Sequence, residues 1–144
     1  MSEITILLGQ TLEFEGSPFD TGPDAARHHA QGAVAVAGGT IAAVGPRDTV
    51  LNAYSGAKTV NYGDKLILPG FVDAHAHYPQ TAIIASWGKR LIDWLNTYTF
   101  PEEMRFADPA YAAGVAGRYL DLLLVNGTTS VASYCTIHPG SVTA

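Results

Sequence analysis

The sequence predicts an α/β protein made of two units, a β-rich unit over residues 1–65 and a strand–helix–strand unit over residues 66–144. Three observations indicate this division. Apolar and polar residues alternate along much of the first 65 residues, as they do in half-buried strands. A strongly apolar strand then begins near Leu66. A long helical pattern and a second strand-like segment follow it, which is the order of a parallel βαβ unit.

The N-terminal unit begins with predicted strands at residues 3–8 and 11–15, where apolar and polar side chains alternate with a period of two. A polar loop is predicted over residues 16–32, because this stretch contains two prolines and three glycines. His28 and His29 lie within this loop, so we expect solvated side chains that stay away from an active site.

Glycine and proline organise the rest of this unit. Gly38-Gly39 separates two short apolar segments, and both residues tolerate the positive φ of a hairpin turn. A short helix is predicted from Pro46 to Tyr54, and a further short strand follows over residues 58–63.

The second unit contains a clearly delimited helix. Asp108-Pro109 marks its start, since Asp is a favoured N-cap and Pro a favoured first helical residue. Asn126-Gly127 ends it, and residues 128–137 are rich in β-branched and small residues, as a second parallel strand would be.

A long excursion separates the first strand of this unit from that helix. It is predicted to contain a helix over residues 89–98 that ends before Pro101, because proline disrupts a helix interior. Binding and catalytic residues are often carried on long loops of a rigid scaffold, so this excursion is expected to be functional.

The stretch FVDAHAH at residues 71–77 carries the most specific chemical signal. Its period of two places Phe71, Asp73, His75 and His77 on one face of a strand. Residues at i and i+2 stand roughly 6.5 Å apart at Cα, so the two imidazoles can converge on one ion. His75 and His77 are therefore the predicted metal ligands. Asp73 is expected to stabilise the interior of this unit instead of binding the ion.

The string PGFVDAHAH resembles the first barrel strand of the metal-dependent amidohydrolase superfamily, whose HxH pair supplies two metal ligands. Three further stretches make the resemblance narrower and point to the guanine deaminases: YPQ at 78–80, LIDWLNTYTFPEEMRF at 91–106 and NGTTSVASYCTIH at 126–138. This resemblance implies hydrolysis of guanine to xanthine and ammonia, a reaction of purine catabolism. It is specific over residues 66–140.

The resembled fold is a (β/α)₈ TIM barrel preceded by part of a composite β-sandwich. A complete barrel needs at least about 200 residues. We therefore expect residues 1–65 to be the N-terminal part of the sandwich and residues 66–144 to be the first βαβ portion of an incomplete barrel. The resemblance also implies one Zn²⁺ per active site, or iron in its place, and a homodimer for the complete enzyme.

The same resemblance places two further histidines, a proton-shuttling glutamate and a late aspartate outside this chain. No catalytic residue is therefore assigned here, and the 144-residue chain alone is expected to be inactive. Glu102 and Glu103 are interpreted as the first turn of a helix. Cys135 has no CxxC spacing and is not expected to bind zinc or act as a nucleophile.

Three residues are predicted to bind the substrate. Gln80 follows His77 by three positions, as the substrate-binding glutamine does in the resembled family, and its carboxamide offers both donors and an acceptor to a purine. Trp87 has a ring that can stack on a flat base. His138 lies at the C-terminal end of the second predicted strand, where barrel enzymes place pocket residues.

Composition excludes some partners. The net charge of -5, without a Lys/Arg cluster, argues against nucleic acid and anionic membranes. A single cysteine excludes an intramolecular disulfide. With no apolar run of about 20 residues and no signal-peptide pattern, the chain is expected to be cytoplasmic.

Two alternatives stay open at this point. One is another amidohydrolase that acts on a different heterocycle, of the cytosine, triazine or imidazolone type, since such enzymes share PGFVDAHAH. The other is a non-catalytic binding or assembly module that lacks the rest of the metal site. The segment WLNTYTFPEE favours guanine within the first class.

Overall fold

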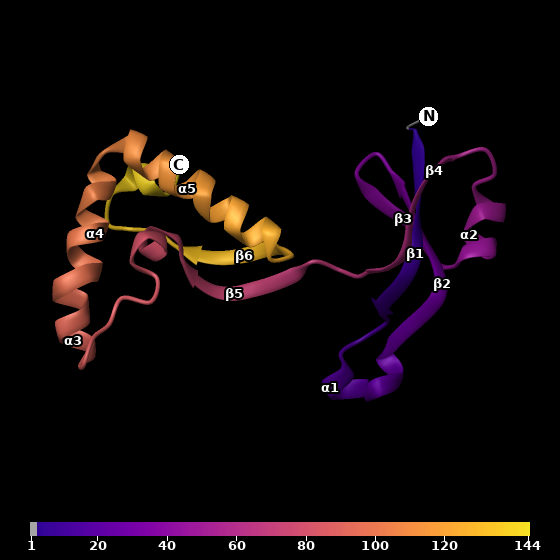
Figure 1. Ribbon diagram of the computed structural model, residues 1–144, viewed down its shortest axis with the longest axis horizontal. Helices are drawn as coiled ribbons and strands as arrows, with labels where there is room; N and C mark the ends of the chain where they lie inside the picture. The colour runs from indigo at the N-terminus through magenta and orange to yellow at the C-terminus, as the bar shows by residue number, and fades with distance from the viewer. Residues whose placement is uncertain (1–2) are drawn as a thin grey trace. The chain divides into compact units, whose positions relative to one another are not determined.

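The computed structural model describes residues 3–144 and divides them into two compact units, which meet between Pro69 and Gly70 (Figure 1). The sequence places this boundary four residues earlier. The difference arises because Leu66 and Ile67 still pair with the first strand of the N-terminal sheet.

The N-terminal unit is a four-stranded mixed sheet in the order β3-β2-β1-β4. Its strands are β1 (Ile4–Phe14), β2 (Ala26–Ala37), β3 (Thr40–Pro46) and β4 (Lys58–Ile67). β1 runs antiparallel to β2 and parallel to β4. The two strands predicted at the N-terminus are one strand with a bulge between Gly9 and Thr11, which explains why the alternation changes there.

Local turn chemistry sets the connections in this sheet. Gly38 and Gly39 adopt φ values of 58° and 79°, which confirms the predicted hairpin between β2 and β3. The predicted helix is α2 (Arg47–Ala53), and its Val50 packs against Ile6 and Ala33 of the sheet.

The predicted loop over residues 16–32 is shorter than expected. It contains α1 (Pro18–Thr21) and the 3₁₀ turn Pro23–Ala25, and β2 already begins at Ala26. The placement of His28 and His29 in a loop is therefore wrong. They lie on β2, because the backbone there pairs with β1, His28 opposite Leu12 and His29 opposite Thr11. Their ring nitrogens also lie 3.0 and 3.3 Å from the side chains of Gln10 and Glu13.

The second unit contains the predicted parallel βαβ arrangement. β5 (Phe71–His77) pairs in parallel with β6 (Thr128–Tyr134), and α5 (Pro109–Val125) connects them (Figure 1). The Asp108 carboxylate accepts a hydrogen bond of 2.9 Å from the Ala110 N–H, as an N-cap should. Gly127 ends the helix with a φ of 80°, a conformation that glycine adopts without strain.

The helix in the excursion continues past Pro101, so the prediction that it ends before this proline is wrong. It runs through α3 (Leu91–Trp94), a π turn (Leu95–Thr99), α4 (Phe100–Met104) and a 3₁₀ turn (Arg105–Ala107). Pro101 has no N–H and its ring would clash with the carbonyl four residues earlier in a regular α-helix. The π turn widens the helix at this point, and the Phe100 N–H bonds to the Leu95 carbonyl, five residues back.

A buried aromatic cluster holds this excursion against α5. Tyr78, in the 3₁₀ segment Tyr78–Ile83, packs edge-on against Phe106 at 5.5 Å between ring centroids, and both are buried with Ala112 and Val115 of α5. The Tyr78 hydroxyl donates a 2.6 Å hydrogen bond to the Ser141 carbonyl. The chain that leaves β5 is therefore fixed directly after His77.

Among the described residues, no helix combines the length and the apolar character needed to cross a membrane.

Candidate metal centre and substrate pocket

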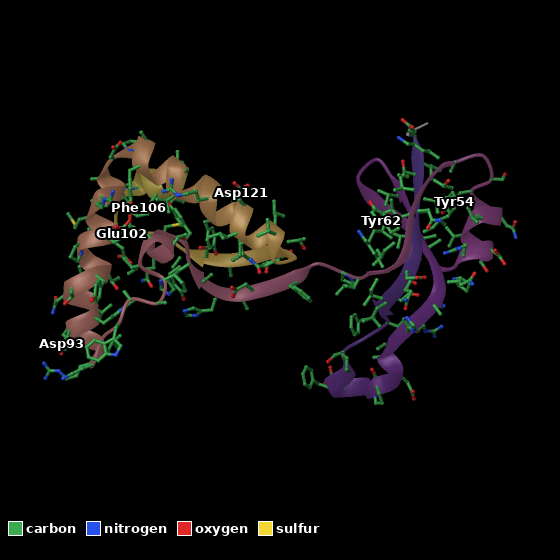
Figure 2. All side chains as sticks on the ribbon, viewed as in Figure 1. Tyr54, Tyr62, Asp93, Glu102, Phe106 and Asp121 are labelled. Atoms are coloured by element: carbon green, nitrogen blue, oxygen red, sulfur yellow. The ribbon has the colours of Figure 1, made fainter. Side chains whose placement is uncertain are left out.

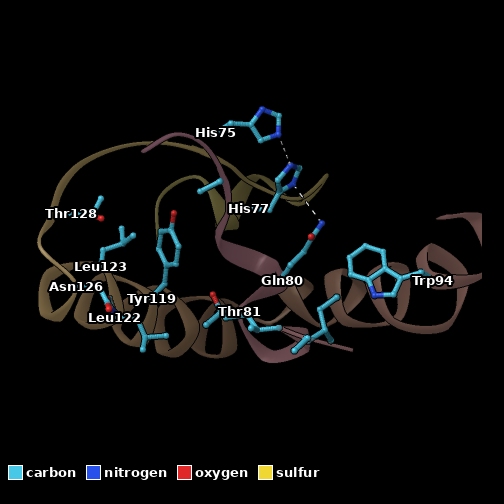
Figure 3. A pocket seen from close by; sticks show the side chains of 14 residues that line it. His75, His77, Gln80, Thr81, Trp94, Tyr119, Leu122, Leu123, Asn126 and Thr128 are labelled. Atoms are coloured by element: carbon cyan, nitrogen blue, oxygen red, sulfur yellow. Dashed lines mark hydrogen bonds between the residues drawn. The ribbon is translucent and has the colours of Figure 1, made fainter. Parts of the chain in front are cut away.

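The two predicted metal ligands come together at the end of β5. The Nε2 atoms of His75 and His77 lie 3.2 Å apart, and both side chains are exposed (Figure 3). The strand carries an irregularity between Asp73 and Ala76, where three steps on β5 match two on β6. Such a bulge re-aims the side chains beside it.

This separation suits a shared metal ion. Two nitrogen ligands of a tetrahedral zinc, each about 2.0–2.1 Å from the ion, stand about 3.3 Å apart. Neutral imidazoles are common zinc ligands. The donor pair therefore fits zinc in both spacing and chemistry.

Neighbouring groups hold the two rings. The Asp73 carboxylate accepts a 3.0 Å hydrogen bond from the His75 backbone N–H, which fixes the turn of the strand at the bulge. Tyr134 on β6 lies beside both rings and stacks on His77, at 4.7 Å between centroids and 19° between planes. The role of Tyr134 is not visible in the sequence, because it depends on the parallel pairing of His77 with Tyr134.

Residues 3–144 contain no cluster of three or more His, Cys, Asp or Glu side chains that could hold a metal ion. The described part of the chain thus brings together the two predicted ligands, His75 and His77, without a third candidate beside them.

A pocket of about 520 Å³ opens beside the histidine pair. His75, His77 and Gln80 form part of its wall, and Ile83, Ile84, Trp94 and residues of α5 form a largely apolar remainder (Figure 3). Its volume lies in the usual range for small-molecule sites, about 300–1,000 Å³.

The structure brings Gln80 into this pocket, beside His77. Its Nε2 atom lies 3.5 Å from His77 Nδ1 and 3.2 Å from Glu103 Oε1, so the carboxamide stands between the predicted ligand and an acidic residue of α4. The sequence predicts Glu103 only as a residue in the first turn of a helix, and its hydrogen bond to Gln80 was not predicted.

The other two predicted substrate residues lie elsewhere. Trp87 is 71% exposed and lines a separate hollow with Trp94 and Tyr98. His138 is outside the pocket wall, and its Nε2 is buried without a hydrogen-bond partner. Trp94 is the tryptophan that reaches the pocket, and its indole N–H donates a 2.8 Å hydrogen bond to the Ser86 hydroxyl.

Glu102, the neighbour of Glu103, contacts Arg105 and Tyr111 and does not contact Gln80. It is buried, lies 3.0 Å from Arg105 Nη1 and accepts a hydrogen bond from the Tyr111 hydroxyl. Figure 2 shows Glu102 and Phe106 on the inner side of the helix, toward the rest of this unit. Burial and the adjacent carboxylate together raise the pKa of the Tyr111 hydroxyl above its usual value.

Family models match both parts of the chain. Residues 66–142 match the model described as the amidohydrolase family, and residues 32–54 match that of a bacterial imidazolonepropionase-like composite domain.

Curated relatives include several guanine deaminases. The guanine deaminase of Escherichia coli K12 is 46% identical over 84 residues, which cover 58% of this chain and 19% of that protein. A Deinococcus radiodurans protein named "Probable guanine deaminase" is 41% identical over 124 residues, which cover 83% of this chain and 28% of that protein. A 5-methylthioadenosine/S-adenosylhomocysteine deaminase of Nitratidesulfovibrio vulgaris is 38% identical over 101 residues, covering 69% of this chain and 22% of that protein.

Solved structures agree with these relatives. The guanine deaminase of Bradyrhizobium japonicum matches with a TM-score of 0.92 and 32% identity, covering 98% of this chain and 31% of that one. The guanine deaminase of C. acetobutylicum, solved with bound guanine in the active site, has a TM-score of 0.81 and 32% identity, covering 96% of this chain and 32% of that one. This chain thus spans about a third or less of the proteins that it matches, and it belongs to the amidohydrolase family as a guanine deaminase-like member.

Proposed function

We propose that this chain forms part of a zinc-dependent guanine deaminase and contributes two metal ligands and one wall of the substrate site. The observation that carries the proposal is the convergence of His75 and His77, 3.2 Å apart at Nε2, beside a pocket that includes Gln80. Similarity to guanine deaminases over most of the chain supports the choice of substrate.

His75 and His77 would hold the zinc. Zinc held there would lower the pKa of a coordinated water to about 7 and so would supply a hydroxide nucleophile at neutral pH. Asp73 and Tyr134 keep the two imidazoles in place, through the hydrogen bond to the His75 N–H and through ring stacking. Positioned ligands of this kind need little reorganisation when a metal binds.

Gln80 would bind and orient guanine. Its carboxamide can pair with the mixed donor and acceptor edge of the base, and the apolar part of the pocket can exclude water from the ring faces. We place the remaining ligands and the proton-transferring carboxylate on other strands of a complete (β/α)₈ barrel, with residues 1–65 in its composite sandwich.

The test uses the full-length protein that contains this segment. Purified protein should convert guanine to xanthine with release of ammonia, and should contain about one zinc per active site by elemental analysis. The double variant His75→Ala/His77→Ala should lose both the metal and the activity. His28→Ala, on β2 of the other unit, is the matched control and should keep both.

Two outcomes would contradict the proposal. Full zinc content in the double histidine variant would remove these residues as ligands. A wild-type protein that leaves guanine intact but deaminates 5-methylthioadenosine would favour the second candidate, since a deaminase of that substrate is 38% identical over 69% of this chain.

A further inference from the structure

The Glu103 side chain makes a hydrogen bond to Gln80, outside its own helix and outside the buried aromatic cluster. Its Oε1 atom lies 3.2 Å from Gln80 Nε2, while the residue itself is partly buried and does not line the pocket. Gln80 comes from the 3₁₀ segment after β5 and Glu103 from α4, so the hydrogen bond joins these two elements.

The chemistry of this contact fixes which way the Gln80 carboxamide faces. An ionised carboxylate only accepts hydrogen bonds, so it holds the NH₂ group and leaves the carboxamide oxygen on the opposite side. His77 Nδ1 is 3.5 Å from the same nitrogen, but in a neutral imidazole that holds zinc through Nε2 it would carry the proton and could not accept a hydrogen bond from the NH₂ group. That distance exceeds the usual 2.7–3.2 Å range of N–H hydrogen bonds, and hydrogen bonds to charged groups are the stronger kind.

We propose that Glu103 is a positioning residue that orients the Gln80 carboxamide, so that its oxygen is the group offered to the ligand. A fixed acceptor selects heterocycles that present a ring N–H or an amino group at this point, as guanine does, over those that present a bare ring nitrogen. This inference rests on the proposed function and adds to it a residue that does not touch the substrate.

A double-mutant cycle in the full-length enzyme tests the inference. Glu103→Gln keeps the size of the side chain but can present either its oxygen or its NH₂ group, so the carboxamide of Gln80 is free to rotate. We expect kcat/KM for guanine to fall about tenfold in Glu103→Gln, the scale of one charge-assisted hydrogen bond. The zinc content should not change.

The decisive comparison is the same change in the Gln80→Ala background. If Glu103 acts through Gln80, Glu103→Gln should alter kcat/KM by less than about twofold there. An undiminished loss in that background, or no loss in either, would overturn the inference while the deamination of guanine by the wild type still supports the proposed function. A wild type that does not act on guanine would overturn both.

Glu102→Gln is the matched control, because it changes the adjacent residue of the same helix. Glu102 contacts Tyr111 and Arg105 instead of Gln80, so this variant should lower the free energy of unfolding. Any effect of Glu102→Gln on kcat/KM should be the same with and without Gln80→Ala. Glu103→Asp is the second variant in case Glu103→Gln does not fold. It shortens the carboxylate by one methylene and should show the same dependence on Gln80.

Discussion

Glu102 is the clearest case in this chain of a charged side chain that burial would penalise without partners. Its side chain is 8% exposed, and it has Arg105 Nη1 at 3.0 Å and the Tyr111 hydroxyl as hydrogen-bond donors. The Arg105 guanidinium also lies over the Tyr111 ring, 4.0 Å from the centroid. The three side chains therefore stabilise each other and connect α4 to α5.

The substitution Tyr111→Phe should destabilise the protein. It removes the hydroxyl and leaves the buried Glu102 carboxylate with one partner instead of two, at a cost of about 1–3 kcal/mol. Urea unfolding followed by circular dichroism would measure the loss. Tyr62→Phe is the control, since Tyr62 is 43% exposed, and its free energy of unfolding should stay close to that of the wild type. Equal values for the two variants would argue against a stabilising role of the Glu102 contact.

The sequence was sufficient to predict that His75 and His77 converge, but not what surrounds them. His75 and His77 are two residues apart on one strand, so their convergence depends on local geometry alone. The contacts of Tyr134 and Glu103 depend on strand pairing and on helix placement, which no local pattern encodes. For the same reason the sequence favoured Trp87, whereas Trp94 is the tryptophan in the pocket wall.

At the scale of single elements, α5 depends on its N-terminal cap. The Asp108 carboxylate bonds to the Ala110 N–H, and Pro109 takes the first helical position. The substitution Asp108→Ala should therefore lower the free energy of unfolding by about 1 kcal/mol.

Chemical denaturation would measure the free energy of unfolding of Asp108→Ala and of a control variant, Asp121→Ala. Asp121→Ala also removes an aspartate from α5, but at an exposed position inside the helix. Its effect should be close to zero. A loss of the same size in both variants would point to the net charge instead of the cap.

Elements that depend on local signals were predicted well. The Gly38-Gly39 hairpin, the Asp108-Pro109 start of α5 and the Gly127 end all have the predicted form. The early start of β2 was missed, because its first residues are polar and become strand only by pairing with β1. The helix through Pro101 was missed because a π turn removes the clash that proline would otherwise cause.

At the scale of the whole chain, two tyrosines make stability depend on alkaline pH. Burial is the main cause that raises the pKa of both Tyr78 and Tyr111 above the usual 10.0. Above about pH 10 the unfolded chain loses protons that the folded chain keeps, so the free energy of unfolding should fall as the pH rises.

Urea unfolding at several pH values between 8 and about 11 would measure this slope. The slope should be smaller in Tyr111→Phe, because one of the two groups is gone. An unchanged slope in that variant would show that the Tyr111 hydroxyl has the same pKa in both states.

The second unit leaves much apolar surface exposed. Val72 on β5, Val125 on α5 and Ile137 after β6 are 72%, 78% and 84% exposed. Parallel sheets are normally covered on both faces. Such exposure agrees with a chain that spans about a third or less of the related proteins.

The π turn between α3 and α4 also sets which residues share one side of that helix. Trp94 and Glu103 are nine residues apart in the sequence. In an uninterrupted α-helix this spacing would place them about 180° apart around the axis. The additional residue in the π turn reduces the angle to about 80°. The π turn, which also accommodates Pro101, therefore sets the angular phase that lets one helix supply both the pocket tryptophan and the partner of Gln80.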